Sequence, residues 1–164
     1  SEIDERFIVN IYAASPLHDI GKVGIPDHVL LKSGKLTEEE FSIMQQHSEI
    51  GASTLRRVTS RYANNAFLQM GIEIAQSHHE RWNGSGYPNH LFGEEIPLSA
   101  RILALCDVYD ALTCKRCYKE AFSHEKSMAI ILAERGQHFD PDITDVFESI
   151  QDQFDAIRKR LHAE

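Results

Sequence analysis

The spacing of apolar residues along the chain predicts a domain built from helices. Segment 4–15 repeats apolar residues at helical intervals, at Phe7, Ile8, Ile11 and Tyr12. Segment 66–81 has the same periodicity and ends in His78-His79-Glu80-Arg81. No segment shows the two-residue alternation of a half-buried strand. We therefore predict an all-α fold.

Capping signals place the remaining helices. Thr37 with Glu40 three residues later forms a capping box, which predicts a helix through His47 and a further helical stretch to about residue 58. Pro97 can open a helix that runs through Thr113, and Ser123 can cap a helix that runs to Gly136. Pro16 either kinks the first helix or opens the next.

The last helix is expected to begin at Asp140-Pro141 and to continue to the C-terminus. It is amphipathic through Ile143, Val146, Phe147, Ile150 and Phe154. This apolar face, if exposed, indicates a homodimer.

Segment 82–97 is rich in Gly, Pro and Asn and is predicted to be a loop. It is longer than most connections within a domain, and such loops tend to be functional.

The overall composition indicates one globular domain, residues 1–164. A net charge of −8 argues against DNA or RNA as a partner, and no apolar stretch is long enough to span a membrane. The start has no signal-peptide pattern, and because it lacks Met we expect further residues before Ser1. Three cysteines, Cys106, Cys114 and Cys117, are too few and odd in number for a disulfide scaffold, which favours a cytoplasmic location.

Metal-ligating residue types recur within these apolar segments. They are His18, Asp19, His47, His78, His79 and Asp107. Imidazoles with carboxylates suit a pair of divalent transition metals, and one carboxylate can bridge the two ions. His18 and Lys22 lie four apart and are expected to share a helix face, which places an ammonium beside the ligands. The alternative is that the histidines are ordinary surface or helix-end residues.

At these residues the chain resembles the HD-GYP domains, a subgroup of the HD phosphohydrolase superfamily. The resemblance covers residues 12–122, leaving helices over 123–164. The matching segments begin with Leu17-His18-Asp19-Ile20-Gly21-Lys22 and continue with Lys32-Ser33-Gly34-Lys35-Leu36-Thr37, His47-Ser48-Glu49-Ile50-Gly51, His78-His79-Glu80-Arg81-Trp82-Asn83-Gly84-Ser85-Gly86-Tyr87-Pro88 and Asp107-Val108-Tyr109-Asp110-Ala111-Leu112-Thr113. It implies a compact bundle of about six to seven helices with a long GYP loop.

The resemblance also implies a function. Such domains are metal-dependent phosphodiesterases that hydrolyse cyclic di-GMP with a metal-bridged hydroxide, as signalling output modules behind a sensor or receiver domain. The six residues above match metal ligands, with Asp19 as the bridging and catalytic carboxylate and Lys22 facing metal or phosphate. Arg116 and Lys119 match residues that bind the substrate phosphates. Tyr87 belongs to the GYP loop, which contacts the substrate site as well as partner proteins. Two divalent ions are expected, with three as an alternative, and iron or manganese is favoured over zinc.

The chain departs from this family in two places. Family members supply one more His from an earlier helix, but residues 1–17 contain none. One ion would thus have Asp19, His47, His78 and His79, whereas the other would keep only His18, Asp19 and Asp107. Cys114 and Cys117 replace the usual Ser and Pro; we interpret them as free thiols rather than a metal or redox pair.

Five histidines match no ligand position and are expected at the surface: His28, His90, His124, His138 and His162. The sequence therefore predicts a cyclic di-GMP phosphodiesterase. Two alternatives remain: an inert signalling module that binds without turnover, and a hydrolase of another nucleotide phosphoester.

Overall fold

The chain folds entirely into helices and loops in the part that the computed structural model describes, residues 3–59, 62, 65–114 and 121–161. The elements run in the order α1 Glu5–Ala14, η1 Ser15–Leu17, η2 Ile20–Gly24, α2 Asp27–Leu30, α3 Glu38–Thr59, α4 Ala66–Ser77, η3 Gly93–Glu95, α5 Leu98–Thr113, α6 His124–Ala133, α7 Pro141–Ser149 and α8 Gln151–Leu161. The prediction of an all-α fold is confirmed. The described residues contain eight α-helices, rather than six to seven.

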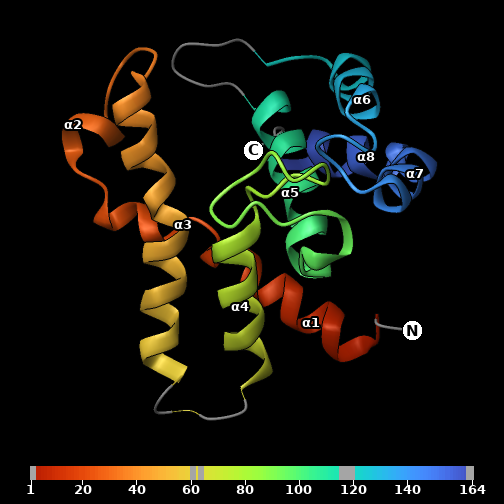
Figure 1. Cartoon of the computed structure of the whole chain (residues 1–164). Coiled ribbons are helices and arrows are strands. Elements are labelled where there is room, and N and C mark those ends of the chain that lie inside the picture. Colours follow the sequence, from red (N-terminus) through yellow and green to blue (C-terminus); the bar gives the residue numbers. More distant parts are fainter. Residues whose placement is uncertain (1–2, 60–61, 63–64, 115–120, 162–164) are drawn as a thin grey trace.

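Helix α4 is the centre of the arrangement. It runs alongside the long helix α3 and is crossed by α1, while α6, α7 and α8 form a separate group against α5 (Figure 1). Met70 and Ile74 of α4 pack against α1 and α5, and Ile72 and Ala75 pack against α3. Because Ile74 is fully buried, its truncation to Ala would cost about 2–5 kcal/mol of stability.

The second group of helices has its own apolar core. It is formed by Leu105, Tyr109, Met128, Ile131, Phe139 and Phe147. Since Leu105 and Tyr109 lie on α5 on either side of Asp107, this core fixes the helix that carries a predicted ligand.

The predicted helix starts are found where their capping chemistry places them. Thr37 and Glu40 form the expected reciprocal capping box, with Glu40 N–H donating to Thr37 Oγ1 at 3.2 Å and Thr37 N–H donating to Glu40 Oε2 at 2.8 Å. Ser123 caps α6 and Asp140 caps α7 through their side-chain oxygens. These starts were predictable because each depends on residues within one turn of the helix.

Four boundaries or faces differ from the prediction. The helix expected over 66–81 ends at Ser77, and α6 ends at Ala133 rather than at Gly136. The last helix is two helices, α7 and α8, which meet at Ile150. In α1 the buried face is centred on Ala14, so Ile8 and Tyr12 of the predicted apolar face are exposed.

The apolar face of the last helices lies largely inside the chain. Phe147 is buried, and Ile143 and Phe154 pack against the same core. Val146 remains exposed. The face on which we based a homodimer is thus mostly covered, and dimerisation stays a prediction. Among the described helices, none is both long and apolar enough to cross a membrane.

Candidate metal centre

The predicted ligands come from separate elements that meet at one place. His18 follows η1, Asp19 precedes η2, His47 lies in α3, His78 and His79 follow α4, and Asp107 lies in α5. His18 and Asp19 form the turn between two short 3-10 helices and do not lie in the regular helix we expected. Lys22 therefore lies one turn from Asp19, where its ammonium binds the carboxylate at 2.5 Å.

Glycines bring the aspartate close to α3. A Cβ on Gly21 would collide with the carbonyl oxygen of His47 and would lie 2.5 Å from the backbone nitrogen of Gly51. Only glycine allows η2 to approach α3 this closely. Asp19 is thereby held beside His47.

Three imidazoles are oriented by backbone carbonyls. Nδ1 of His18 lies 2.8 Å from Ser15 O, Nδ1 of His47 lies 2.7 Å from Met44 O, and Nδ1 of His78 lies 3.0 Å from Ile74 O. A proton on each Nδ1 leaves the Nε2 lone pair free, which is the arrangement of metal-binding histidines.

The free nitrogens converge on Asp19. Oδ1 of Asp19 lies 3.5 Å from Nε2 of His47 and 3.9 Å from Nε2 of His78, while Oδ2 lies 3.3 Å from Nε2 of His18. Ligand atoms of Asp19, His47, His78 and His79 all lie within 4.8 Å of one another. Nε2 of His47 and of His78 is buried without a hydrogen-bond partner. A divalent cation would satisfy both nitrogens, so these residues fit a metal.

Asp19 thus lies between two groups of side chains that differ in burial. The buried side consists of His47, His78 and His79; His47 and His78 are almost fully enclosed. The open side consists of His18, Lys22 and Asp107, with Nε2 of His18 at 3.8 Å from Oδ1 of Asp107. The side chains of the open side are between 24% and 41% exposed.

The pKa values of the side chains differ between the buried side and the open side. Burial lowers the pKa of His78 to about 4 and that of His79 to about 2, which keeps both imidazoles neutral and able to bind metal. In its protonated form His18 donates a hydrogen bond to Asp19, which raises the pKa of His18 despite partial burial; in the neutral form, with the proton on Nδ1, its Nε2 is available to a metal. Burial would raise the pKa of Asp19, but hydrogen bonds from His18 and Lys22 outweigh it and hold the pKa well below its ordinary value.

The loop over 82–97 packs one aromatic ring onto this centre. The ring of Tyr87 stacks on His79 with centroids 4.7 Å apart, and the Tyr87 N–H donates to His79 O at 3.2 Å. A side chain on Gly86 would collide with the backbone of Glu80 and Arg81. The loop is therefore folded back onto the two histidines that precede it.

Sequence reasoning missed the residue that holds this loop. Glu80 is only 2% exposed, and its carboxylate accepts hydrogen bonds from Asn89 N–H at 2.7 Å and Leu91 N–H at 3.1 Å. A glutamate is rarely buried, and a single sequence carries no signal for it beyond the position of Glu80 directly before a long loop.

Two of the five histidines expected at the surface are at least half-buried: His124 is buried and His138 is half-buried. His124 is buried, with Nδ1 at 2.8 Å from the hydroxyl of Tyr109. Burial lowers the pKa of His138 to about 4, with Arg81 adding to the effect. His28 and His90 are exposed as predicted. Arg116, Cys117, Lys119 and His162 lie outside the described residues, so the predictions on them stay open.

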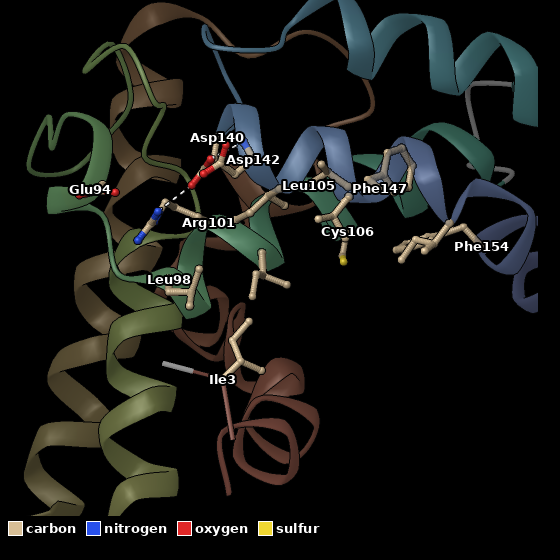
Figure 2. A pocket seen from close by; sticks show the side chains of 14 residues that line it. Ile3, Glu94, Leu98, Arg101, Leu105, Cys106, Asp140, Asp142, Phe147 and Phe154 are labelled. Carbon is tan, nitrogen blue, oxygen red and sulfur yellow. Dashed lines mark hydrogen bonds and ion pairs between the residues drawn. The ribbon is translucent and has the colours of Figure 1, made fainter. Parts of the chain in front are cut away.

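A separate cavity lies along α5. It has a volume of about 590 Å³ and a mainly apolar lining, which also includes the ion pair of Arg101 and Asp140 at 2.6 Å (Figure 2). Its described lining includes Cys106, the neighbour of Asp107, but none of the six predicted ligands. Burial raises the pKa of the Cys106 thiol to about 11, so this thiol is unreactive at neutral pH.

The fold and the centre together define an all-helical domain with a histidine-aspartate site fit for metal. The model of the HD domain family matches residues 1–143, and the chain belongs to this family. The family predicted from the sequence is confirmed.

Relatives share much of the chain. It is 52% identical over 151 residues to a Vibrio cholerae protein named cyclic di-GMP phosphodiesterase, covering 92% of this chain and 31% of the relative. It is 49% identical to the Xanthomonas campestris cyclic di-GMP phosphodiesterase response regulator RpfG, covering 87% and 36%. It is 47% identical to a Vibrio cholerae 3'3'-cGAMP-specific phosphodiesterase 2, covering 90% and 27%. The chain thus spans about a third of the length of these relatives.

Proposed function

We propose that this chain is the metal-dependent phosphodiesterase domain of a protein that hydrolyses cyclic di-GMP. The observation that carries the proposal is Asp19, whose two oxygens face different sets of ligands. Oδ1 faces His47 and His78, and Oδ2 faces His18. A carboxylate in this position can bridge two ions, as two-metal phosphoester hydrolases require.

We assign the ligands to two divalent ions. Asp19, His47, His78 and His79 would hold the first, and His18, Asp19 and Asp107 would hold the second. Imidazole and carboxylate ligands suit iron, manganese or zinc better than magnesium or calcium, and we favour iron or manganese. The first set is already gathered in one place, which supports tighter binding there.

Bound divalent metals would supply a water of lowered pKa and stabilise charge on the phosphate. The chain's own residues orient the substrate. Lys22 presents a partly exposed ammonium beside Asp19, where it can neutralise a phosphate oxygen. Burial together with Asp19 and Asp107 raises the pKa of Tyr87, so its phenol stays neutral and can donate a hydrogen bond. Arg116 and Lys119 remain our candidates for the substrate phosphates.

The test should include a second cyclic dinucleotide. One relative at 47% identity is named as specific for 3'3'-cGAMP, so a different cyclic dinucleotide is the alternative. Another relative is named as a response regulator, which supports a receiver domain as the partner within the full-length protein. We infer a cytoplasmic location from the intracellular messenger proposed as substrate. Contacts of the GYP loop with signalling proteins stay a proposal.

The test combines metal content with turnover. Anaerobically purified protein should contain two ions per chain and should open cyclic di-GMP faster than 3'3'-cGAMP. Asp19→Ala should lose both metal and turnover, whereas Asp152→Ala, a change at an exposed carboxylate on α8, should lose neither. Two bound ions without hydrolysis of either dinucleotide would contradict the proposal and support an inert module. Faster hydrolysis of 3'3'-cGAMP would revise the proposed substrate but not the proposed type of reaction.

A further inference from the structure

Three aromatic rings lead outward from the metal centre. Tyr87 stacks on His79, and Phe41 of α3 meets Tyr87 edge to face, with ring centroids 6.1 Å apart and planes at 84°. The first ring belongs to a candidate ligand, and the last, that of Phe41, is exposed at the protein surface. The series therefore connects the proposed reaction site with the surface.

The side chain of Phe41 is open to solvent over about half of its surface. Its side chain is 47% exposed although it lies on the first turn of a long helix. A single exposed phenylalanine needs no explanation. This one differs because it contacts Tyr87, the ring that stacks on a candidate ligand, while about half of its surface stays open to solvent. A flat and accessible ring is what base stacking requires.

The charged residues near Phe41 favour a neutral base over a phosphate at this position. The first turn of α3 carries Glu38, Glu39 and Glu40, with Glu40 paired to Lys32 at 2.5 Å. An anionic phosphate would be repelled by the two remaining carboxylates, whereas a neutral purine would not. The positive end of the site is Lys22, beside Asp19. The polarity thus places phosphate at Lys22 and a base at Phe41.

We propose that Phe41 is a stacking platform for one purine base of a cyclic dinucleotide whose phosphate lies at the metal centre. This inference rests on the proposed function and adds a specificity-determining residue to it.

Kinetics test the role of the ring. Phe41→Leu keeps an apolar side chain but removes the aromatic face, and should raise KM for cyclic di-GMP at least about fivefold, the lower range for loss of one stacked base. The value of kcat should change less than twofold. Turnover of bis(4-nitrophenyl) phosphate, which has no purine, should be affected much less. Phe41→Trp should restore KM, and Phe92→Leu, at another exposed aromatic side chain, should leave it unchanged.

Equal losses with both substrates, or a fall in kcat alone, would overturn the proposal and assign Phe41 to support of Tyr87. Tryptophan fluorescence provides an independent readout, because the chain has only one native tryptophan. The fluorescence of the Phe41→Trp variant should be quenched on titration with cyclic di-GMP. Absence of quenching at saturating ligand would also overturn the proposal. Failure of the wild-type chain to hydrolyse the dinucleotide would instead contradict the proposed function, and the quenching titration would still decide the stacking role.

Discussion

The two sides of Asp19 contain similar ligands in different physical states. On the buried side, His47 and His78 are 1% and 2% exposed, and their Nε2 atoms have no hydrogen-bond partner. On the open side, the His18 and Asp107 side chains are 24% and 35% exposed and interact with each other. One half of the centre is thus preorganised by the core of the domain, whereas the other half depends on contacts nearer the surface.

The largest effect should come from replacing a single imidazole, on the buried side in one variant and on the open side in another. His78→Asn should lower metal affinity more than about 100-fold, beyond what loss of an outer partner of a ligand causes. His18→Asn should remove one ion and leave the other. Elemental analysis after dialysis against a weak chelator, with circular dichroism as the folding control, measures both. Equal metal loss in the two variants would show that the sides are not distinct.

The next effect concerns the backbone contact that forms the buried side. Gly21→Ala would force η2 away from α3, and we expect a loss of about 3 kcal/mol in the free energy of unfolding. Gly34→Ala is the matched control, since a Cβ there meets nothing within 4 Å, and should change stability by less than about 1 kcal/mol. Urea titration of both metal-free variants gives the values. If the two curves coincide, close approach at Gly21 does not hold the site.

A smaller effect should follow from loosening the loop that covers His79. In Glu80→Gln, an amide N–H₂ group would replace one of the two oxygens that accept from Asn89 and Leu91. Leaving one buried donor unpaired costs about 1–3 kcal/mol, and we expect kcat/KM to fall about tenfold. Steady-state kinetics with metal content held constant measures this. Glu94→Gln, at an exposed carboxylate, is the control and should retain full activity.

The smallest effect should come from His138, a histidine whose pKa is lowered although it is not a candidate metal ligand. His138 is only half-buried, but burial together with the nearby Arg81 lowers its pKa to about 4, and it belongs to no ligand group among the described residues. An unfolded chain would protonate this side chain near pH 6.5. Its contribution to stability is therefore complete above pH 6.5 and is lost as the pH falls toward 4.

The slope from one such group is at most about 1.4 kcal/mol per pH unit. His138→Gln should reduce the loss of stability of the metal-free protein between pH 7 and pH 5. Urea titrations at both pH values measure the difference. An identical pH dependence in the two proteins would mean that His138 does not titrate differently on folding.

Local chemistry explains what the sequence predicted well. The capping box of Thr37 and Glu40, the caps at Ser123 and Asp140, and the periodicity of α4 depend on neighbours within a turn or two, and each was found. The convergence of His47 and His78 on Asp19 was predicted from residue types and from the family resemblance.

Other features depended on contacts between distant segments. The burial of Glu80 arises from loop amides about ten residues away, and the burial of His124 arises from its packing against Tyr109 of α5. The 3-10 turns around Asp19 follow from the approach of η2 to α3. No pattern within a short window of sequence encodes these contacts.

The candidate ligands lie far apart in sequence, on elements from η1 to α5. An ion held by them would join these elements as a cross-link does, and an unfolded chain offers no comparable site. Each tightly bound ion would then add to the free energy of unfolding in proportion to the logarithm of its concentration over its Kd. Metal supply would thus set the folded fraction of the domain as well as the proposed activity, and chelation would make the chain easier to digest with a protease.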